Sequence, residues 1–333
     1  MNFIEPKVSY IEQKSGLEGI YKQIEYVGRS CWMSQNMIKE DSAASFVEKL
    51  KNSEHNSPLE HGSVYLKSTN CGFKLIKYQT NPYSRYKSVF EKSELVDDEK
   101  QDYYTEYVST NYRVLVENNW LDDLEYLCEP TEFHTPRITF HFTCQRAISA
   151  EYNRHRVNSP MESSSRYCNF SKEKFGQELS ICPSNWIIDE ANNLAVQKYF
   201  RRPKDIDALN SLNLGLVQYC YEVGNGYDIK DMNAVDYWLF ANLACEHSYI
   251  NLIRLGRTPD EARDILPFDL KTELYHTAFL DDWIHFCSLR AYKTERNNPH
   301  REAKVLANGV LTILKMLNYI KDEETEETEE TDK

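Results

Sequence analysis

The chain has 333 residues, 41% of them hydrophobic, and a formal net charge of -13. This length suffices for a large buried core, while the acidic balance argues against a nucleic-acid-binding protein, which normally presents a basic surface. No segment approaches the roughly 18 consecutive apolar residues of a membrane span, and the start lacks the basic and apolar regions of a signal peptide, so we expect a cytoplasmic protein without a membrane or nucleic-acid partner.

The nine cysteines are scattered along the chain without a C-x-x-C pair. An odd number of cysteines without framework spacing indicates neither disulfide bonds nor a zinc site. We therefore predict reduced, mostly packed thiols and no bound metal.

The N-terminal part of the chain is predicted to be helical. Ser15 and Glu18 have the spacing of a capping box, and apolar residues then follow one helical face at Leu17, Ile20, Ile24 and Val27. A second helix is predicted from about Ser42 to Leu50.

The period of the hydrophobic pattern then changes to that of strands. The alternation in SVYLKST (63–69) and in PRITFHFTC (136–144) predicts two strands. Between them, a Tyr-rich stretch is predicted to be hairpin-like sheet over Phe73–Phe90 and Tyr112–Val116. We interpret the segment from about 67 to 136 as an elaborated β-rich insertion between the two strands.

The pattern is helical again from Gln145 up to the R-H-R motif at 154–156. Further helices are predicted around Leu209–Val223, Ala234–Leu255, Pro259–Leu266, Leu280–Tyr292 and Arg301–Ile320. Strands and helices are thus segregated along the chain, which predicts an α+β fold with an antiparallel-type sheet, surrounding helices and a helical C-terminal half. We expect a single domain over residues 1–320. The acidic tail, 321–333, is too charged to fold and is predicted to be disordered.

The stretch RHRVNSPMESSSRY (154–167) concentrates positive charge in an otherwise acidic chain. Neighbouring guanidinium groups repel one another increasingly as water is removed, so such a cluster usually needs an anion. Pro160 stops a regular helix, which predicts a loop or a new helix start after it, lined by Ser163, Ser164 and Ser165 beside Arg166. Hydroxyls, backbone N–H groups and a guanidinium together suit a phosphate. For any one of these residues alone, a surface loop with scattered charge is the simpler interpretation.

Two arginines further along the chain stand out by their position on predicted helices. Thr258 to Glu261 has the features of a helix start, and Arg263 follows one turn later. Arg290 shares a helical face with Trp283, Phe286 and Cys287, and an arginine on an apolar face needs an anionic or hydrogen-bonding partner. A structural salt bridge is the alternative for Arg290.

The segment EHNSPLEH contains His55, Glu60 and His61. These residue types suit a metal, but no third ligand group is evident, so core or capping roles are favoured.

Together these motifs resemble the flavin-dependent thymidylate synthases, whose signature is R-H-R-x-x-S-x-N-E-x-S-x-R-Y. The matching residues are Arg154, His155, Arg156, Ser159, Glu162, Ser164, Arg166 and Tyr167, and Met161 replaces the Asn. His55–His61 is similar to the His-x-(Thr/Ser)-Pro-x-Glu-His element of that family, and Arg263 and Arg290 have the spacing of its two C-terminal arginines. The chain departs from the family at Phe279-Leu280-Asp281 in place of Asn-x-Arg, at His285 in place of an Asn, and at Glu151 in place of a Gln.

The resemblance implies an enzyme that makes dTMP from dUMP, with methylenetetrahydrofolate as carbon donor, NADPH as reductant and FAD as cofactor. It also implies a homotetramer with active sites shared between subunits. Arg290 would be the catalytic residue, because a guanidinium beside the uracil carbonyls stabilises the negative charge that makes C5 nucleophilic. Substrate contacts are expected from Glu151, Arg154, Glu162, Ser163, Ser164, Ser165, Arg166, Arg263 and Arg290. Cofactor contacts are expected from His55, Ser57, Arg154, His155, Arg156, Glu162 and His285.

Several alternatives stay open from the sequence. Ser164 could serve as a nucleophile, but no base is evident beside it, so hydrogen bonding is favoured. The Pro-Cys-His type nucleophile of the usual thymidylate synthase does not occur. The departures at Met161, Glu151 and Phe279 leave room for an inactive or altered-specificity flavin- and nucleotide-binding homologue. A nucleic-acid-binding module is the least favoured alternative.

Overall fold

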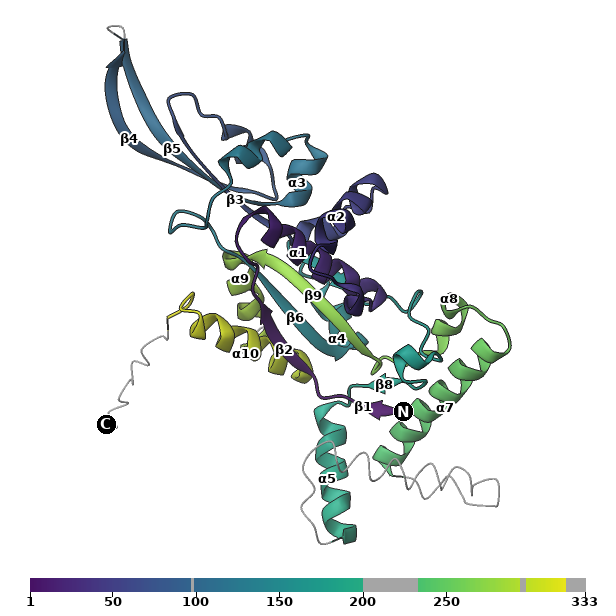
Figure 1. Ribbon diagram of the computed structural model, residues 1–333. Coiled ribbons are helices and arrows are strands. Elements are labelled where there is room, and N and C mark those ends of the chain that lie inside the picture. The colour runs from purple at the N-terminus through teal and green to yellow at the C-terminus, as the bar shows by residue number, and fades with distance from the viewer. Residues whose placement is uncertain (97–98, 200–232, 294–297, 322–333) are drawn as a thin grey trace, which may run out of the picture.

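The computed structural model describes residues 1–96, 99–199, 233–293 and 298–321. Its centre is a four-stranded antiparallel sheet in the order β2–β6–β9–β7 (Figure 1). The strands come from widely separated parts of the chain: β2 Lys7–Ile11, β6 Arg137–Gln145, β7 Ser159–Glu162 and β9 Lys271–Phe279. Because β9 pairs with both β6 and β7, the C-terminal part of the chain holds the middle part in place.

One face of this sheet packs against three helices, which are α4 (Arg146–Tyr152), α9 (Leu280–Arg290) and α10 (Arg301–Met316). Alternation along β6 places Ile138, Phe140 and Phe142 on this face, where all three are buried. Trp283 of α9 packs edge-on against Phe140, with 4.8 Å between ring centroids. Its Nε1 also donates a 3.0 Å hydrogen bond to the backbone oxygen of Ile138. Trp283 therefore fixes α9 relative to β6.

The opposite face packs against α1 (Gly16–Gly28) and the short helix η3 (Ser57–His61), and α2 (Ser42–Asn52) packs on α1. Gln23 of α1 donates from Nε2 to Thr139 Oγ1 of β6 at 3.1 Å. Met161 of β7 is buried here against Val27 and Tyr275. The methionine that replaces the Asn of the signature thus belongs to an apolar cluster.

A second antiparallel sheet, in the order β3–β5–β4, carries a long ribbon that projects from the body (Figure 1). Its strands are β3 Ser63–Asn70, β4 Arg85–Val96 and β5 Glu99–Asn111. From Phe90 to Val96 every side chain of β4 is exposed. The short helices of this region are η4 Ile76–Thr80, α3 Tyr112–Glu117 and η5 Leu121–Tyr126.

The remaining elements pack around β1 (Asn2–Phe3), which pairs in parallel with β8 (Ser180–Ile181). The helices of this region are α5 Asn185–Tyr199, α7 Ala234–Arg254 and α8 Pro259–Ala262. Four short 3₁₀ helices complete the description: η1 Arg29–Trp32, η2 Gln35–Met37, η6 Glu173–Phe175 and η8 Arg263–Ile265. None of the helices in these described ranges combines the length and the apolar character needed to cross a bilayer.

The predicted α+β fold class is confirmed, as are the helices predicted near residues 16, 42, 145, 234, 280 and 301. The last three end at Arg254, Arg290 and Met316. The helix predicted at Leu209–Val223, and all but the first residue of the acidic tail, lie outside the described residues. The boundaries predicted for the domain and the insertion stay predictions.

Several local predictions are wrong. Tyr112–Val116 is helical, because the Asn111 side chain accepts a hydrogen bond from Val114 N–H and caps the start of α3. The hairpin comprises β4 and β5 and overlaps the predicted Phe73–Phe90 only from Arg85 onward, since Ile76–Thr80 forms a 3₁₀ turn. Met161 and Glu162 continue strand β7 after Pro160, which is tolerated because β7 is an edge strand, and the predicted loop lined by Ser163–Ser165 begins only after Glu162. Ser15 does not cap α1, since its hydroxyl donates to Glu129 instead.

Replacing Trp283 with Ala is expected to lower the free energy of unfolding by about 3–5 kcal/mol, because a fully buried indole is lost and a cavity remains. Ile284→Ala is the matched control on the same helix: Ile284 is 46% exposed, and its loss should change the free energy by less than about 0.5 kcal/mol. Denaturant unfolding followed by circular dichroism measures both. Equal effects of the two substitutions would contradict the role of Trp283.

Candidate active site

The R-H-R motif lies in the turn that joins α4 to β7. Two backbone hydrogen bonds close the turn, from His155 N–H to Tyr152 O at 3.0 Å and from Asn158 N–H to His155 O at 3.1 Å. Arg154 and Arg156 are exposed, whereas the ring of His155 packs on Phe286 with 4.8 Å between centroids. The turn therefore presents two guanidinium groups to solvent and is anchored by the histidine between them.

Arg290, the last residue of α9, binds this turn and the helix before it. Its Nη1 donates to Glu151 Oε2 at 2.6 Å, and its Nη2 donates to the Glu151 backbone oxygen at 2.9 Å. Its Nε donates to His155 Nε2 at 3.0 Å. Nη1 of Arg154 lies 3.8 Å from Glu151 Oε1. A guanidinium has more N–H donors than these bonds use, so part of its donor capacity is not engaged by the described residues. The first cluster of predicted site residues is thus Glu151, Arg154, His155 and Arg290.

His155 is neutral in this arrangement. Because Nε2 accepts a hydrogen bond from Arg290, the ring carries its proton on Nδ1. Burial, followed by the charges of Arg290 and His285, lowers the pKa of His155 to about 4. The positive charge of the R-H-R motif at neutral pH therefore comes from its two arginines.

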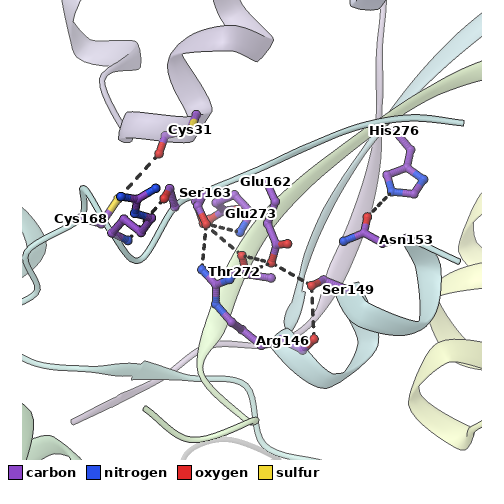
Figure 2. Close-up of polar contacts among 12 residues, drawn as sticks. Cys31, Arg146, Ser149, Asn153, Glu162, Ser163, Cys168, Thr272, Glu273 and His276 are labelled. Atoms are coloured by element: carbon purple, nitrogen blue, oxygen red, sulfur yellow. Dashed lines mark hydrogen bonds and ion pairs between the residues drawn. The ribbon is translucent and has the colours of Figure 1, made fainter. Parts of the chain in front are cut away.

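Glu162, the last residue of β7, lies in a network of hydrogen bonds (Figure 2). Its Oε1 accepts from Ser149 Oγ and from Thr272 Oγ1, each at 2.8 Å, and Arg146 Nη1 lies 3.4 Å away. Arg146 Nη2 also donates to the backbone oxygen of Ser163 at 2.8 Å, and Ser163 Oγ lies 3.0 Å from Thr272 Oγ1. The network thus joins Arg146 and Ser149 of α4 to the end of β7 and to Thr272 of β9.

The serine segment after β7 is held by η1. Ser164 N–H donates to the backbone oxygen of Cys31 at 2.9 Å, and Figure 2 shows Cys31 and Ser163 on the two facing segments. Ser164 Oγ accepts from Arg166 N–H at 3.3 Å, while Ser165 is buried. The segment is thereby fixed with the guanidinium of Arg166 outside it.

Arg166 and Arg263 meet at one carboxylate, and these two arginines with Asp260 form the second cluster. Arg166 Nε donates to Asp260 Oδ1 at 2.9 Å, and Arg263 Nη2 lies 3.3 Å from the same oxygen. Asp260 is held in the first turn of α8, where Thr258 and Glu261 form a complete capping box. An oxygen between two guanidinium groups marks a position suited to an oxygen of a bound anion.

The structure does not bring every predicted residue to these clusters. His55 and Ser57 are exposed at the start of η3, and His55 Nδ1 lies 3.3 Å from Ser53 Oγ. His285 is exposed on α9, close enough to His155 to lower its pKa. Arg156 forms no hydrogen bond or ion pair with a described residue.

The residues considered for a metal have partners within the fold. Glu60 pairs with Arg113, and His61 Nδ1 lies 2.7 Å from Thr277 Oγ1. Within the described ranges, no group of three or more His, Cys, Asp or Glu side chains is arranged to hold a metal ion.

An arginine from the ribbon lies at the segment where the chain departs from the family pattern. Arg85 of β4 stacks on Phe279, with 4.2 Å from its guanidinium carbon to the ring centroid. Its Nη2 also lies 3.1 Å from Asp281 Oδ2 and 3.3 Å from Asp282 Oδ2. Asp281 therefore pairs with a cation supplied by another segment of the chain.

The sequence patterns do not identify the residues that support the two clusters, namely Arg146, Ser149, Thr272 and Asp260. Asp260 has a usable signal, since it lies in a capped first turn one turn before Arg263. Thr272 has none, because β9 is buried on both faces and shows no alternation.

Three of the cavities formed by the described residues contain no side chain of either cluster in their lining. One, of about 130 Å³, lies among Tyr10, Tyr65 and Arg137. The side chains of the second cluster are exposed, whereas Arg290 of the first cluster is only 16% exposed.

The family model for the thymidylate synthase complementing protein matches residues 75–317. The chain belongs to this family. The match includes both clusters and confirms the resemblance carried by the R-H-R signature. His55 and Ser57 precede the matched residues.

The chain is also similar to two solved structures of the UMP/dUMP methylase PolB from Streptomyces cacaoi, one bound with 5-Br dUMP and one with 5-Br UMP. The identity is 14% in both cases, and the TM-scores are 0.39 and 0.40. The alignments cover 95% of this chain and 93% or 92% of that chain. Comparison with curated proteins gave no match.

An NMR titration of His155, assigned by comparison with His155→Gln, is expected to give a pKa of about 4 rather than 6.5. Arg290→Gln should raise this pKa, because it removes a neighbouring positive charge, whereas Arg254→Gln at an exposed position of α7 should not. Since the folded-state pKa is lowered, the unfolded chain binds this proton first as the pH falls, so the group lowers stability only below about pH 6.5. A His155 pKa that Arg290→Gln leaves unchanged would contradict the pairing.

Proposed function

We propose that this chain is a flavin-dependent thymidylate synthase, which makes dTMP from dUMP with methylenetetrahydrofolate as carbon donor and NADPH as reductant. The observation that carries the proposal is the convergence of Arg166 and Arg263 on one oxygen of Asp260, in a chain of this family. Two guanidinium groups around one oxygen suit a phosphate monoester. A second group of arginines, in the R-H-R turn, suits a second phosphorylated ligand.

The dUMP phosphate would replace the carboxylate of Asp260 between Arg166 and Arg263. Both arginines are partly exposed, with side-chain accessibilities of 53% and 39%, so a ligand can reach them from solvent. The segment Ser163–Ser165 would supply hydroxyl and backbone donors beside them. Orientation of the nucleotide by its phosphate then lowers the entropic cost of placing the uracil for reaction.

The exposed arginines of the R-H-R turn fit the phosphates of FAD. Arg156 has no partner among the described residues, and Arg154 has only a 3.8 Å ion pair, so both are available to a polyanion. Further contacts to FAD are proposed for His55, Ser57, Glu162 and His285. When bound there, FAD would supply the redox chemistry that the reaction requires.

Arg290 would act on the uracil ring. Its guanidinium is held by Glu151 and His155 and keeps unused N–H donors, which would donate to a uracil carbonyl and stabilise the negative charge that develops there. Neutral His155 orients this guanidinium without adding a repelling charge. Glu162 and Arg154 would complete the nucleotide side of the site.

We further propose a homotetramer in the cytoplasm whose active sites are shared between subunits. One observation supports sharing: His55 and Ser57, two of the proposed cofactor contacts, form no hydrogen bond with either cluster within the described residues. Residues of a neighbouring subunit would then complete each active site.

One contact favours a homologue with altered activity as the second candidate. The carboxylate of Glu151 lies 2.6 Å from Arg290, and an adjacent anion reduces the electrostatic stabilisation that a guanidinium can give to a developing oxyanion. In that case flavin and nucleotide would bind, but methylation of dUMP would be slow.

The visible absorption spectrum of the purified protein, recorded anaerobically with and without NADPH and dUMP, tests the proposal. We expect oxidised-flavin bands that NADPH bleaches at a rate altered by dUMP, followed by dTMP formation once methylenetetrahydrofolate is added. A protein that takes up no added FAD would refute the proposal. Flavin reduction without dTMP would support the second candidate.

Arg290→Ala is expected to lower the rate of dTMP formation by about 100-fold or more, the usual effect of removing a donor to a developing oxyanion. FAD uptake should persist, since the exposed arginines of the turn remain. Arg254→Ala is the matched control and should leave turnover unchanged. Full turnover of Arg290→Ala would remove Arg290 from the mechanism.

Asp260→Asn is expected to tighten dUMP binding by about threefold to tenfold, because the phosphate no longer displaces a carboxylate from the two guanidinium groups. Binding of deoxyuridine, which has no phosphate, should not change. Asp264→Asn, in the adjacent η8, is the control. Isothermal titration measures all these affinities, and weaker dUMP binding by Asp260→Asn would mean that Asp260 holds the arginines in place for the ligand.

A further inference from the structure

A fully buried histidine lies beneath the R-H-R turn and takes no part in the reaction proposed above. His276 is on β9, where it pairs with Phe140 of β6 on one side and with Pro160 of β7 on the other. It therefore occupies the middle of the central sheet, between the strand that leads into α4 and the strand that follows the turn.

Both ring nitrogens of His276 meet asparagines at the two ends of the turn. Nε2 lies 3.1 Å from Asn153 Oδ1, which Figure 2 shows, and Nδ1 lies 3.2 Å from Asn158 Nδ2. Asn153 directly precedes Arg154, and Asn158 is the last residue before β7. One side chain thus spans the ends of the segment that carries the R-H-R motif.

This arrangement requires one protonation state. Nε2–H donates to the Asn153 carbonyl oxygen, and Nδ1 accepts from the Asn158 amide, which is the neutral imidazole. Burial, followed by the charge of His155, lowers the pKa of His276 to about 3, so the ring stays neutral at physiological pH. An imidazolium would present two donors and lose the bond from Asn158.

We propose that His276 is a positioning residue for the R-H-R turn. By joining Asn153 to Asn158 it fixes the distance between the two ends of the turn, and it thereby sets the direction in which Arg154 and Arg156 leave the surface. The turn itself has two closing backbone hydrogen bonds, to Tyr152 and His155, and a strand paired on both sides is a more rigid support than a loop. The assignment of FAD phosphates as the ligand of these arginines depends on the proposed function. The anchoring of the turn by His276 does not depend on it.

Two variants separate this role from a general effect on stability. His276→Phe keeps an aromatic ring and removes both hydrogen bonds. His134→Phe is the matched control: His134 is also buried, and its Nε2 and Nδ1 lie 3.1 Å from the Leu66 backbone oxygen and 3.0 Å from Thr131 Oγ1. Both proteins are compared with the parent well below their unfolding midpoints.

The measurements are hydrogen exchange of the amides in 153–158 and the FAD dissociation constant by fluorescence quenching. In His276→Phe we expect exchange and the dissociation constant each to rise by about tenfold, the effect of losing one or two hydrogen bonds. His134→Phe should change neither. If His276→Phe fails to fold, Asn153→Ala at the exposed end of the turn should reproduce both effects in weaker form.

Unchanged exchange in the folded variants would overturn the proposal, and so would faster exchange with the parental affinity for FAD. A double substitution, Asn153→Ala with Asn158→Ala, provides a further check, because adding His276→Phe to it should have little further effect on FAD binding. If the parent protein itself takes up no FAD, the proposed function fails, and the exchange data still decide whether His276 anchors the turn.

Discussion

The need to pair buried polar groups governs how this molecule assembles its candidate site. Strand β9 is buried on both faces yet contains Thr272, His276 and Thr277, each fully buried. An unpaired buried polar group costs about 1–3 kcal/mol, so these side chains must find partners. Thr272 meets Glu162 and Ser163, which follow the turn. His276 meets Asn153 and Asn158 at the two ends of the turn, and Thr277 meets His61 of η3. The segments that bear the site are therefore held by the polar residues of one strand.

The sequence predicts those parts of the fold in which a single feature, such as one buried face or one contiguous motif, determines the pattern of residues. Amphipathic helices such as α1 and α9 can be predicted because only one face is buried. The R-H-R signature can be recognised because its charged residues are contiguous. Strand β9 cannot be predicted in this way, because burial of both faces removes the alternation of apolar and polar residues. Arg85 reaches Phe279 and Asp281, and Arg166 reaches Asp260, only through tertiary contacts, which no local pattern encodes. The sequence therefore indicates which residues act, and the structure adds which residues hold them.

Each group of arginines at the site is paired with an acidic side chain of the chain itself. Glu151 pairs with Arg290, and Asp260 pairs with Arg166 and Arg263. These pairs reduce the mutual repulsion of the guanidinium groups in the absence of a ligand. Binding of an anion at Asp260 would then be an exchange of one negative group for another, so its selectivity depends on geometry and on how many donors the incoming group can accept from.

The ribbon formed by β4 and β5 is attached to the site at its base. Arg85 is the first residue of β4. It contacts Phe279, Asp281 and Asp282, where β9 is followed by α9. The side chains from Phe90 to Val96 are exposed and lie beyond this attachment. We therefore expect substitutions and changes of length in the outer ribbon to leave the position of α9 and Arg290 intact. Over evolutionary time that part of the chain can diverge faster than its base, because its sequence is not constrained by the packing that places the arginines.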